Sequence, residues 1–554
     1  MHRPVDTRVV PYPADREARY LATGAWDPSP TAERFHAVAE QFGDRTAVID
    51  ELGSISYRQL DRRSDEVAAA MLTGGIRPGD PILFQVGNSI TTIVAWYAVL
   101  KSGAIPVATL AGHRKHEIGH VAKLVGAVGH IVDDSQPDRF DMVDFAQERA
   151  RDSRTLTHIF TVGSGRAGRH AGVSRIEDLG LADGPAAARQ AVEAVQSELG
   201  PRDVAVYQLS GGTTGAPKVI PRLHGEYWNN GRAWALALDR DERSVTCHAG
   251  PVIHNAGITC GLHGTHSVGA CLVLPPPDKT IALNMMRNHH VDDTIFGHGM
   301  FSWVMSDSYP SVAAHLRTVL LSGAKVPEDV FARVEQFGAR VGQTFGMSEG
   351  LFTLTPLTAP RHLRSSTVGT PLTGDDEIRI LDPDGETEMP DGDAGELVCR
   401  GWYTIPGYFD APEHNAVAFT SDGFYRTGDL GRIDVHDGQR YLSIEGRIKD
   451  LINRGGEKIN AEELELLLHQ HPSVTDVAVV SMPDAVLGER VCAYLVTSGP
   501  DLGVPDIQKH LDALGVAKYK WPERVEISPA LPRTQVGKID KKALRADVEA
   551  KLTA

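Results

Sequence analysis

The sequence predicts an α/β protein with a large N-terminal domain of layered sheets and helices and a small α+β C-terminal domain. Three observations predict this fold. The chain has 554 residues, more than one hydrophobic core usually serves. Strand-like and helical runs alternate from residue 45 onward, which is typical of helices layered on sheets. From residue 441 a strand, a charged turn and an amphipathic helix change the pattern, and a compact region follows.

The N-terminal elements follow from the spacing of the apolar residues. Ser56 is placed to cap the first helix of the alternating region, because its hydroxyl can accept a backbone N–H of the first turn. Residues 151–200 are weakly patterned, and we expect a surface connection with one amphipathic helix there. The strand-like runs are 46–50, 81–86 and 130–134, and the helical runs are 56–72 and 92–103.

The C-terminal region begins after the strand at residues 441–447. Two further strand-like runs, 476–483 and 490–497, and a helical run at 504–514 suggest a small α+β domain. We place the boundary near Arg447 to Lys449. The expected domains are 1–448 and 449–554.

Composition and charge exclude several classes of protein. Hydrophobic residues make up 42% of the chain, and charged residues 23%, as in ordinary globular proteins. The formal net charge of −16 argues against a general nucleic-acid or membrane-surface binder. The N-terminal residues contain no apolar signal segment, and 18 uninterrupted apolar residues occur nowhere. We therefore expect a cytoplasmic protein.

The cysteines form neither a disulfide framework nor a zinc motif. They are odd in number and widely spaced, without a C-x-x-C pair. Such usage indicates reduced thiols. The five cysteines are Cys247, Cys260, Cys271, Cys399 and Cys492.

A loop rich in glycine and hydroxyl groups follows the strand-like run that starts at Val206. Its glycines allow backbone N–H groups to approach phosphate oxygens, its hydroxyls donate further bonds, and Lys218 supplies positive charge. The common P-loop requires Lys directly after Gly and a hydroxyl directly after Lys. Here Pro217 precedes the lysine and Val219 follows it, which weakens a kinase or GTPase interpretation. The alternative is a solvated surface loop.

Five segments, in the same order along the chain, resemble motifs of the adenylate-forming superfamily of acyl-CoA synthetases, luciferases and peptide-synthetase adenylation domains. Five matches are far more specific than one. The resemblance implies that the protein uses ATP to activate a carboxylic acid as its acyl-AMP. The segments are LSGGTTGAPKVIPR (209–222), FGMSEG (345–350), FYRTGDL (424–430), GRIKDLINRGGEKI (446–459) and LPRTQVGKIDKKALR (531–545).

Within the superfamily the chain most resembles stand-alone aryl-acid AMP ligases of siderophore and related pathways, such as 2,3-dihydroxybenzoate- and salicylate-AMP ligases. This resemblance includes RYLATGAWDPSP (19–30), KVIPRLHGEYWNN (218–230) and AKYKWPERVEI (517–527). No carrier segment with a phosphopantetheine serine follows. The resemblance therefore implies an aromatic acid substrate and a separate aryl or peptidyl carrier protein as acceptor, and it permits a monomer.

The resemblance also assigns roles in ATP binding. Lys218 and Ser348 would contact the phosphates during catalysis, and Glu349 would hold Mg²⁺, a hard cation suited to carboxylate oxygens. Asp429 would accept hydrogen bonds from both ribose hydroxyls, with Arg447 reaching the same sugar or the phosphate. The remaining nucleotide-binding residues are Ser210, Gly211, Gly212, Thr213, Thr214, Gly215, Gly346 and Met347.

Domain rotation is the second property that the resemblance implies. Lys538 would bridge the acid carboxylate and the α-phosphate as a compact point charge. Lys449 occupies the hinge position. After rotation, Gly455 and Gly456 would line the tunnel for a pantetheine thiol, because glycine allows close approach to the backbone.

Asn255, after His254, matches the residue that reads the ortho-hydroxyl in aryl-acid ligases. Its neutral amide can donate and accept, whereas amino-acid-activating domains usually carry an Asp there. Ala256 and Cys260 depart from the Tyr and Ser of the dihydroxybenzoate pattern, and similar cysteine-bearing relatives favour salicylate. The remaining pocket candidates are His298, Ser322, Gly323 and Thr344.

His298 and Thr344 make the expected pocket more polar than that of the relatives. His298 is either a structural histidine or a contact to a second ring substituent or ring nitrogen. The candidate acids are salicylate, substituted salicylates, hydroxyanthranilates and hydroxylated pyridine or quinoline carboxylates. The alternatives to this function are an aryl- or acyl-CoA ligase and a non-catalytic nucleotide-binding regulator.

Overall fold

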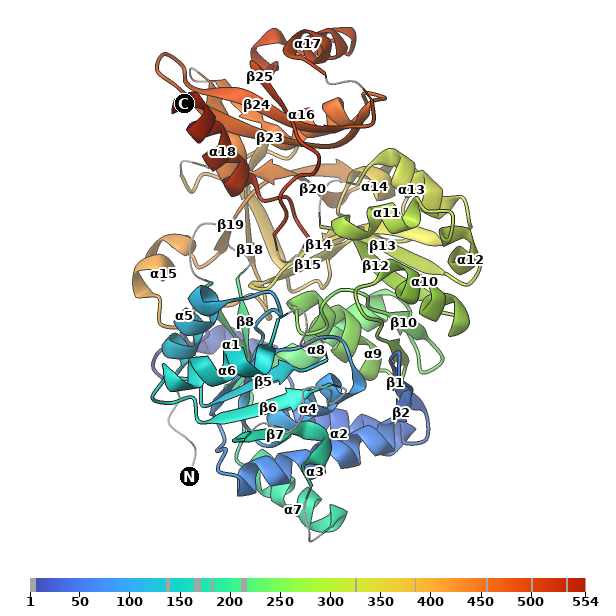
Figure 1. The fold of residues 1–554 in the computed structure, drawn as a ribbon, viewed down its shortest axis with the longest axis vertical. Coiled ribbons are helices and arrows are strands. Elements are labelled where there is room, and N and C mark those ends of the chain that lie inside the picture. The colour runs from blue at the N-terminus through green and yellow to red at the C-terminus, as the bar shows by residue number, and fades with distance from the viewer. Residues whose placement is uncertain are drawn as a thin grey trace.

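The computed structural model describes residues 6–135, 140–163, 171–180, 184–210, 217–323, 326–383, 385–454, 457–499, 502–534 and 537–553. These residues form four β-sheets with helices packed against them. Figure 1 shows a large lower region, coloured blue to yellow-green, and a smaller orange-red region above it. The predicted α/β class is confirmed.

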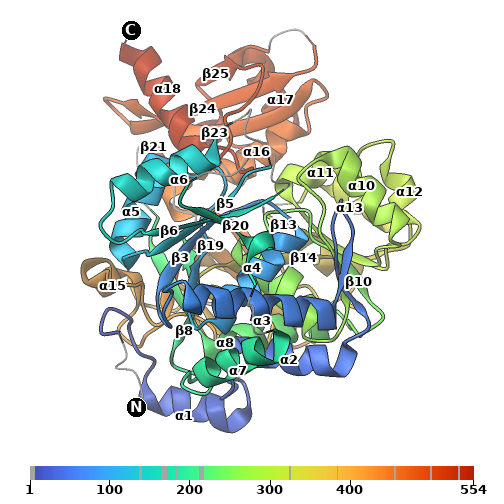
Figure 2. The same cartoon turned by 60° about the horizontal axis from the view of Figure 1, so that its bottom comes forward.

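A seven-stranded sheet has the order β7-β6-β5-β3-β4-β8-β9, and β8 and β9 form its antiparallel edge. Helices α5 and α6 pack on one face. Helices α3, α4 and α7 pack on the other (Figure 2). The strands are β3 (Pro81–Gln85), β4 (Ile105–Val107), β5 (Gly129–Asp133), β6 (His158–Val162), β7 (Val173–Arg175), β8 (Val204–Leu209) and β9 (Val219–Leu223). The helices are α3 (Tyr57–Thr73), α4 (Ile90–Lys101), α5 (Lys115–Val125), α6 (Met142–Arg151) and α7 (Pro185–Gln196).

The start of α3 confirms the predicted cap. Ser56 Oγ accepts the Gln59 backbone N–H at 3.2 Å, and Gln59 Oε1 accepts the Ser56 N–H at 2.9 Å. These reciprocal bonds satisfy two N–H groups that a helix start leaves without intrahelical partners.

Residues 151–200 differ from the prediction. They contain the expected helix α7, but they also contain β6 and β7, which extend the seven-stranded sheet. Four of the five residues of β6, HIFTV, are buried. A parallel strand covered on both faces reads as a short apolar run without alternation, which is why periodicity did not reveal it.

A nine-stranded sheet has the order β16-β15-β14-β13-β12-β10-β11-β1-β2, with β10 to β14 parallel at its centre. Helices α10 to α13 pack on one face. The strands are β1 (Thr46–Ile49), β2 (Ser54–Ser56), β10 (Val245–Cys247), β11 (Cys271–Val273), β12 (Asp293–Gly297), β13 (Thr318–Ser322), β14 (Arg340–Met347), β15 (Gly350–Leu354) and β16 (Thr370–Pro371). The helices are α10 (Lys279–Asn288), α11 (Phe301–Val304), α12 (Tyr309–Ala313) and α13 (Glu328–Glu335).

The opposite face of the nine-stranded sheet turns toward a helical layer. This layer contains α8 (His224–Ala237), the π-helix η2 (Gly257–His263) and α9 (Gly264–His266). Trp234 of α8 and Cys260 of η2 share an apolar cluster with Leu320 and Phe352 of the sheet. Helix α2 (Thr31–Phe42) packs against α8 and α3, so the layer joins the two large sheets.

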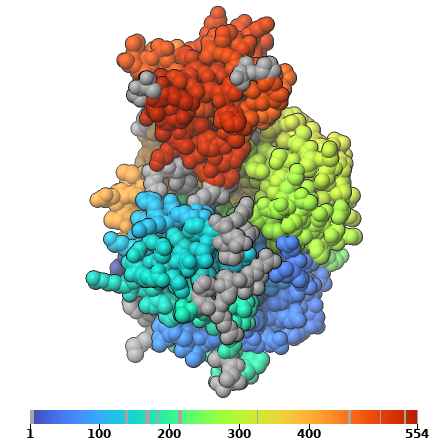
Figure 3. Space-filling model, viewed as in Figure 1, coloured from blue at the N-terminus to red at the C-terminus, as the bar shows by residue number. Residues whose placement is uncertain are grey.

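The remaining sheets lie toward the C-terminus. A four-stranded antiparallel sheet has the order β17-β18-β19-β20, and the small region carries β22-β21-β24-β23 with β25 parallel to β24. In Figure 3 the orange-red surface of this region rests on the larger one. The strands are β17 (Glu377–Leu381), β18 (Ala394–Arg400), β19 (Tyr425–His436), β20 (Gln439–Arg447), β21 (Leu451–Arg454), β22 (Glu457–Asn460), β23 (Val474–Asp484), β24 (Gly488–Thr497) and β25 (Arg524–Ile527).

The C-terminal region is the predicted α+β arrangement of strands and helices. The runs expected as strands are β23 and β24, and the run expected as a helix is α17 (Val504–Ala513). Helices α16 (Ala461–His469) and α18 (Lys541–Thr553) complete it. The four-stranded sheet ends at Arg447 and the next sheet starts at Leu451, so the proposed boundary falls between two sheets.

Candidate functional site

The base of the phosphate loop is a β-hairpin made by β8 and β9. Leu209 pairs with Val219. The Ser210 N–H donates to the Lys218 carbonyl at 2.9 Å, and the Lys218 N–H donates to Ser210 Oγ at 3.1 Å. These bonds fix the ends of the loop. The predicted phosphate-binding residues Gly211, Gly212, Thr213, Thr214 and Gly215 lie outside the described residues.

A tight turn between β14 and β15 presents Ser348 and Glu349. Met347 pairs with Gly350 across this hairpin, so the turn has only these two residues. Gly350 has a φ of +154°, and a Cβ there would lie 2.4 Å from Thr404 Cα. A larger residue at this position would therefore displace the turn from the segment that carries Thr404.

Tyr408 links the two phosphate-side elements. Its hydroxyl donates to Glu349 Oε1 at 2.8 Å and lies 2.8 Å from the Tyr425 hydroxyl. Lys218 Nζ lies 5.3 Å from the centroid of the Tyr408 ring, within the range of a cation–π contact. Sequence reasoning missed this tyrosine, because an isolated aromatic residue carries no signal of its partners.

Asp429 and Arg447 face each other across β19 and β20. Arg447 Nε lies 2.9 Å from Asp429 Oδ1. Asp429 is only 4% exposed, and this burial raises its pKa to about 6, although the positive charges of Arg447 and Lys538 oppose the rise. The carboxylate is therefore the ionised form at neutral pH.

The pKa of Asp429 predicts a pH dependence of ATP binding. Above pH 6 the carboxylate accepts hydrogen bonds at both oxygens, whereas protonation below pH 6 turns one acceptor into a donor. We expect the KM for ATP to rise as pH falls, by up to about tenfold per pH unit for this single group. Steady-state kinetics between pH 5 and 8 measure the KM for ATP, with Asp429→Asn as the control. The prediction is wrong if the Asn variant retains the full wild-type slope.

Lys538 lies at the point where the small region meets the large one. The charges of Arg447 and Asp429 act on it, and burial, followed by the charge of Arg447, lowers its pKa. Lys538 also acts on His254. The structure thus brings together Lys538, the predicted ribose acid and the acid-pocket histidine.

The loop that carries Lys538 is held by its own main chain. The Thr534 N–H donates to the Lys538 carbonyl at 2.6 Å, and Arg533 Nη1 donates to the Gly537 carbonyl at 3.0 Å. Arg533 also pairs with Asp476 of β23 at 2.6 Å. The lysine therefore stands on a braced turn.

Lys449 lies in the short helical turn η4 (Ile448–Asp450) between β20 and β21. Its side chain is exposed. Partial desolvation of its ammonium group by the neighbouring protein atoms, followed by the charge of Arg447, lowers the pKa of Lys449. Its place between two sheets is compatible with the predicted hinge. The predicted tunnel residues Gly455 and Gly456 lie outside the described residues.

Asn255 is buried, and its amide has a fixed orientation. Its Oδ1 accepts from Arg222 Nη1 at 3.2 Å and from the Tyr227 hydroxyl at 3.0 Å. Its Nδ2 donates to the Met347 carbonyl at 3.3 Å. Since an amide nitrogen has two hydrogens, one N–H remains for a ligand. With its oxygen bonded to two described residues, Asn255 can offer a ligand one N–H donor.

The group that orients Asn255 is a buried ion pair that sequence reasoning missed. Arg222, fully buried, donates through Nε and Nη2 to Glu226 at 2.8 Å. The same arginine donates to the Ser348 carbonyl at 3.2 Å. Arg222 thus connects the Ser348 turn with Asn255 of the predicted acid pocket. The four-residue spacing of Arg and Glu was visible in the sequence, but their burial was not.

The predicted pocket hydroxyls are engaged by main chain. Thr344 Oγ1 donates to the Thr353 carbonyl at 2.7 Å, and Ser322 Oγ donates to the Thr344 carbonyl at 3.0 Å. Gly323 follows with a φ of +94°, a backbone conformation that favours glycine. The hydroxyls of Thr344 and Ser322 therefore donate to carbonyls of the neighbouring strands, and a direct role in acid binding stays a prediction.

The described contact of the His298 side chain is with an aromatic ring. Its ring packs edge-on against Phe301 with centroids 5.5 Å apart, and no described residue forms a hydrogen bond with its side chain. Cys260 is 1% exposed within the apolar cluster, and Ala256 packs against the same cluster. Substrate contacts by these residues stay predictions.

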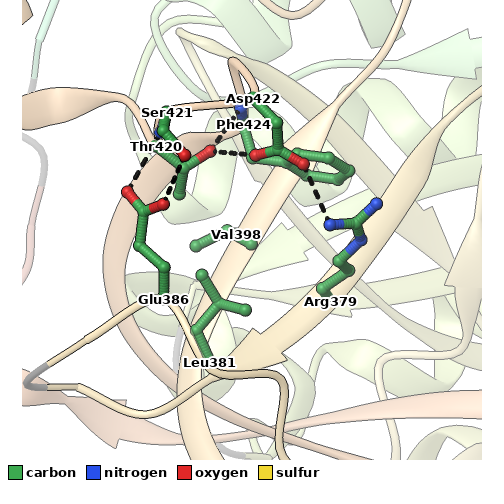
Figure 4. Close-up of a pocket in the computed structure, with 8 residues that line it drawn as sticks. All are labelled: Arg379, Leu381, Glu386, Val398, Thr420, Ser421, Asp422 and Phe424. Carbon is green, nitrogen blue, oxygen red and sulfur yellow. Dashed lines mark hydrogen bonds and ion pairs between the residues drawn. The ribbon is translucent and has the colours of Figure 1, made fainter.

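A hollow on the four-stranded sheet shares no residue with this site. Its volume is about 240 Å³. Figure 4 shows its polar groups paired around an apolar floor: Glu386 accepts from Ser421, and Asp422 accepts from Arg379 at 3.0 Å. The drawn polar side chains are thus occupied by one another, and we assign this hollow no function.

The comparisons with known proteins identify the family. Residues 35–409 match the AMP-binding enzyme family, and residues 463–538 match the AMP-binding enzyme C-terminal domain. The chain belongs to the family of AMP-binding enzymes. The resemblance drawn from the five motifs and the prediction of an adenylate-forming ligase that uses ATP are thereby confirmed.

Individual relatives are similar along nearly the whole chain. A salicylyl-CoA synthase / salicylate adenylyltransferase from a Streptomyces species is 39% identical over 556 residues, covering 98% of each chain. A salicyl-AMP ligase / salicyl-S-ArCP synthetase from Mycobacterium tuberculosis is 38% identical over 549 residues, covering 97% of this chain and 94% of the relative. The apo structure of Mycobacterium smegmatis MbtA is 36% identical, with a TM-score of 0.71 and coverage of 97% and 98%.

Two predictions from composition can be compared with the structure. All five cysteines lie within the described ranges and are free thiols. Among the described residues, no helix is both long and apolar enough to cross a membrane.

Proposed function

We propose that the protein activates an aromatic carboxylic acid with an ortho hydrogen-bond acceptor as its acyl-AMP and passes the acyl group to the phosphopantetheine thiol of a separate carrier protein. The orientation of Asn255 carries the proposal. Its oxygen is occupied by Arg222 and Tyr227, and its remaining N–H can donate to a phenol oxygen or a ring nitrogen. The names of the relatives, two of which refer to salicylate, support this class of acid.

The first half-reaction is the attack of the acid carboxylate on the α-phosphorus of ATP with pyrophosphate as the leaving group. Catalysis depends on holding two anions in line and on stabilising the developing charge. Lys538 is the proposed bridge between the carboxylate and the α-phosphate. Lys218 and Ser348 complete the phosphate side, and Asp429 with Arg447 holds the ribose.

Glu349 is the proposed ligand of Mg²⁺. Its Oε1 accepts from Tyr408, and no described residue forms a hydrogen bond with its Oε2. The described residues contain no group of three or more His, Cys, Asp or Glu side chains that could enclose a metal. A single carboxylate fits Mg²⁺, which keeps several waters and binds substrate phosphates. When bound, the cation would neutralise charge on the phosphates.

The second half-reaction requires access for a thiol. We infer that the domains 1–448 and 449–554 rotate about Lys449, which lies in the short turn between the four-stranded sheet and the sheet of the small region. Coenzyme A is the alternative acceptor, and one relative is named a CoA synthase. Thioester formation with CoA and with holo-carrier protein, measured side by side, decides between them.

Acid-dependent ATP–pyrophosphate exchange tests the proposed substrate class. We expect exchange with salicylate or 3-hydroxypicolinate to exceed that with benzoate. Replacing Asn255 by alanine should lower kcat/KM for the ortho-substituted acid by about 10- to 100-fold, because one hydrogen bond to the ligand is lost.

Benzoate is the internal control, since it presents nothing for Asn255 to bind. Its kcat/KM should change by less than threefold in Asn255→Ala. An equal loss for both acids would refute the assigned role, and wild-type exchange only with aliphatic acids would refute the proposed substrate class.

A further inference from the structure

His248 follows β10 directly and is not among the residues assigned above. Its backbone N–H donates to the Val273 carbonyl at 3.1 Å, which continues the ladder between β10 and β11. Side chains alternate along a strand, so His248 points to the same face as Thr246. The hydroxyl of Thr246 donates to Asp293 Oδ2 at 2.7 Å, and this contact marks the face.

The register of the parallel strands identifies this face as that of the acid pocket. On β12, Ile295 and Gly297 lie on the same face of the sheet as Asp293. Ile295 pairs with Leu320, and Gly297 pairs with Ser322. Ligands of parallel sheets bind at the carboxyl ends of the strands. His248 therefore lies on the wall of the proposed acid site.

Two glycines make room for the imidazole. A Cβ on Gly250 would lie 3.2 Å from His248 Nε2, and a Cβ on Gly261 would lie 3.2 Å from His248 Cγ. Gly261 belongs to η2, directly after Cys260, which sequence analysis placed in the pocket. The ring thus packs between the turn after β10 and the π-helix.

The imidazole is neutral at physiological pH. Burial, with the charges of His254 and Arg240, lowers the pKa of His248 to about 4, and a hydrogen bond with the Pro251 backbone opposes this. A neutral imidazole has one donor and one acceptor nitrogen. One ring nitrogen of His248 can therefore accept a hydrogen bond from a ligand.

His248 lies on the side of the pocket away from the nucleotide turn. Asn255 bonds to the Met347 carbonyl next to that turn. His248 instead packs on Gly261, six residues further along the same helical segment. A substituent that reaches His248 is therefore on the ring edge remote from the group that Asn255 contacts.

We propose that His248 determines specificity by accepting a hydrogen bond from a second polar substituent, a hydroxyl or amino group, on the ring edge remote from the group that Asn255 contacts. The inference rests on the proposed function. It narrows the substrate to an aromatic acid with an ortho acceptor for Asn255 and a distal donor for His248.

Pyrophosphate exchange with salicylates that carry a second hydroxyl, amino or methyl group at each ring position tests the proposal. We expect wild-type kcat/KM to favour one hydroxyl- or amino-substituted acid over both salicylate and its methyl analogue. His248→Leu should lower kcat/KM for that acid by roughly tenfold and change salicylate by less than threefold. His248→Gln, which retains an acceptor, should restore part of the preference.

Asn255→Ala is the matched control. This variant should lower kcat/KM for both salicylate and the preferred hydroxyl- or amino-substituted acid, and the ratio of the two kcat/KM values should stay unchanged. Equal losses for the two acids in His248→Leu, or a wild-type enzyme without preference for any second donor, would overturn the inference while leaving the proposed function intact. A wild-type enzyme that uses no aromatic acid would overturn the proposed function itself. Should His248→Leu fail to fold, the wild-type panel and the Gln variant still decide.

Discussion

We expect the Lys538→Ala variant to lose about 10²- to 10³-fold in kcat for acid-dependent pyrophosphate exchange, the effect typical of removing one preorganised group that stabilises transition-state charge. The structure places Lys538 beside Asp429 and Arg447, on a loop braced by main-chain hydrogen bonds. The lysine is therefore held in position before the acid and ATP react. Removing its side chain should leave the loop intact.

Lys542→Ala is the matched control for this prediction. Lys542 is an exposed lysine at the start of α18, four residues from Lys538. Its removal should change kcat by less than twofold, and thermal unfolding of both variants should match the wild type. Exchange by Lys538→Ala at the wild-type rate, with the protein folded, would exclude the catalytic role.

The second large effect is expected at the ion pair beneath the pocket. Replacing Glu226 by alanine leaves the Arg222 guanidinium buried without its carboxylate, and breaking such a pair costs about 3–5 kcal/mol. Burial raises the pKa of Glu226, and the charge of Arg222 opposes the rise. We therefore expect a marked decrease in the free energy of unfolding, measured by urea denaturation.

A double variant separates stability from orientation of Asn255. Arg222→Met with Glu226→Leu removes both charges, and such replacements are often close to neutral in stability. Stability should therefore return toward the wild type. The preference for salicylate over benzoate should not return, because Asn255 Oδ1 has lost one of its two donors. Full recovery of this preference would show that Arg222 does not orient the amide.

The elements with a clear period were predicted well. Helix α3 starts where Ser56 caps it, and β23, β24 and α17 occupy the expected runs. The missed strands β6 and β7 lie in a segment of weak pattern. β6 pairs with β5 and β7 pairs with β6, so their positions depend on contacts between residues that are separated in the sequence. Local periodicity contains no information about such pairing.

The site was predictable where a motif carries the chemistry. Glu349, Asp429 and Lys538 were predicted from separate segments, and the structure brings these segments together, while the roles of the three residues stay predictions. Tyr408 and Arg222 were not predicted, because their importance arises from neighbours supplied by other elements. The environment of Asn255 also required the structure: its sequence position suggested an amide that donates and accepts, and only the contacts with Arg222 and Tyr227 leave it as a donor.

Strand β14 connects the two halves of the site through one eight-residue segment. Thr344, a predicted pocket residue, is the fifth residue of β14, and Ser348 and Glu349 directly follow the strand, with a rise of about 3.3 Å per residue between them. A change within β14 would disturb acid and nucleotide together. Changes in η2 or in the segment after β10 would alter binding of the acid without altering binding of the nucleotide. New acid specificities are therefore expected to evolve, and to be engineered most safely, at positions such as Ala256, Cys260 and His248.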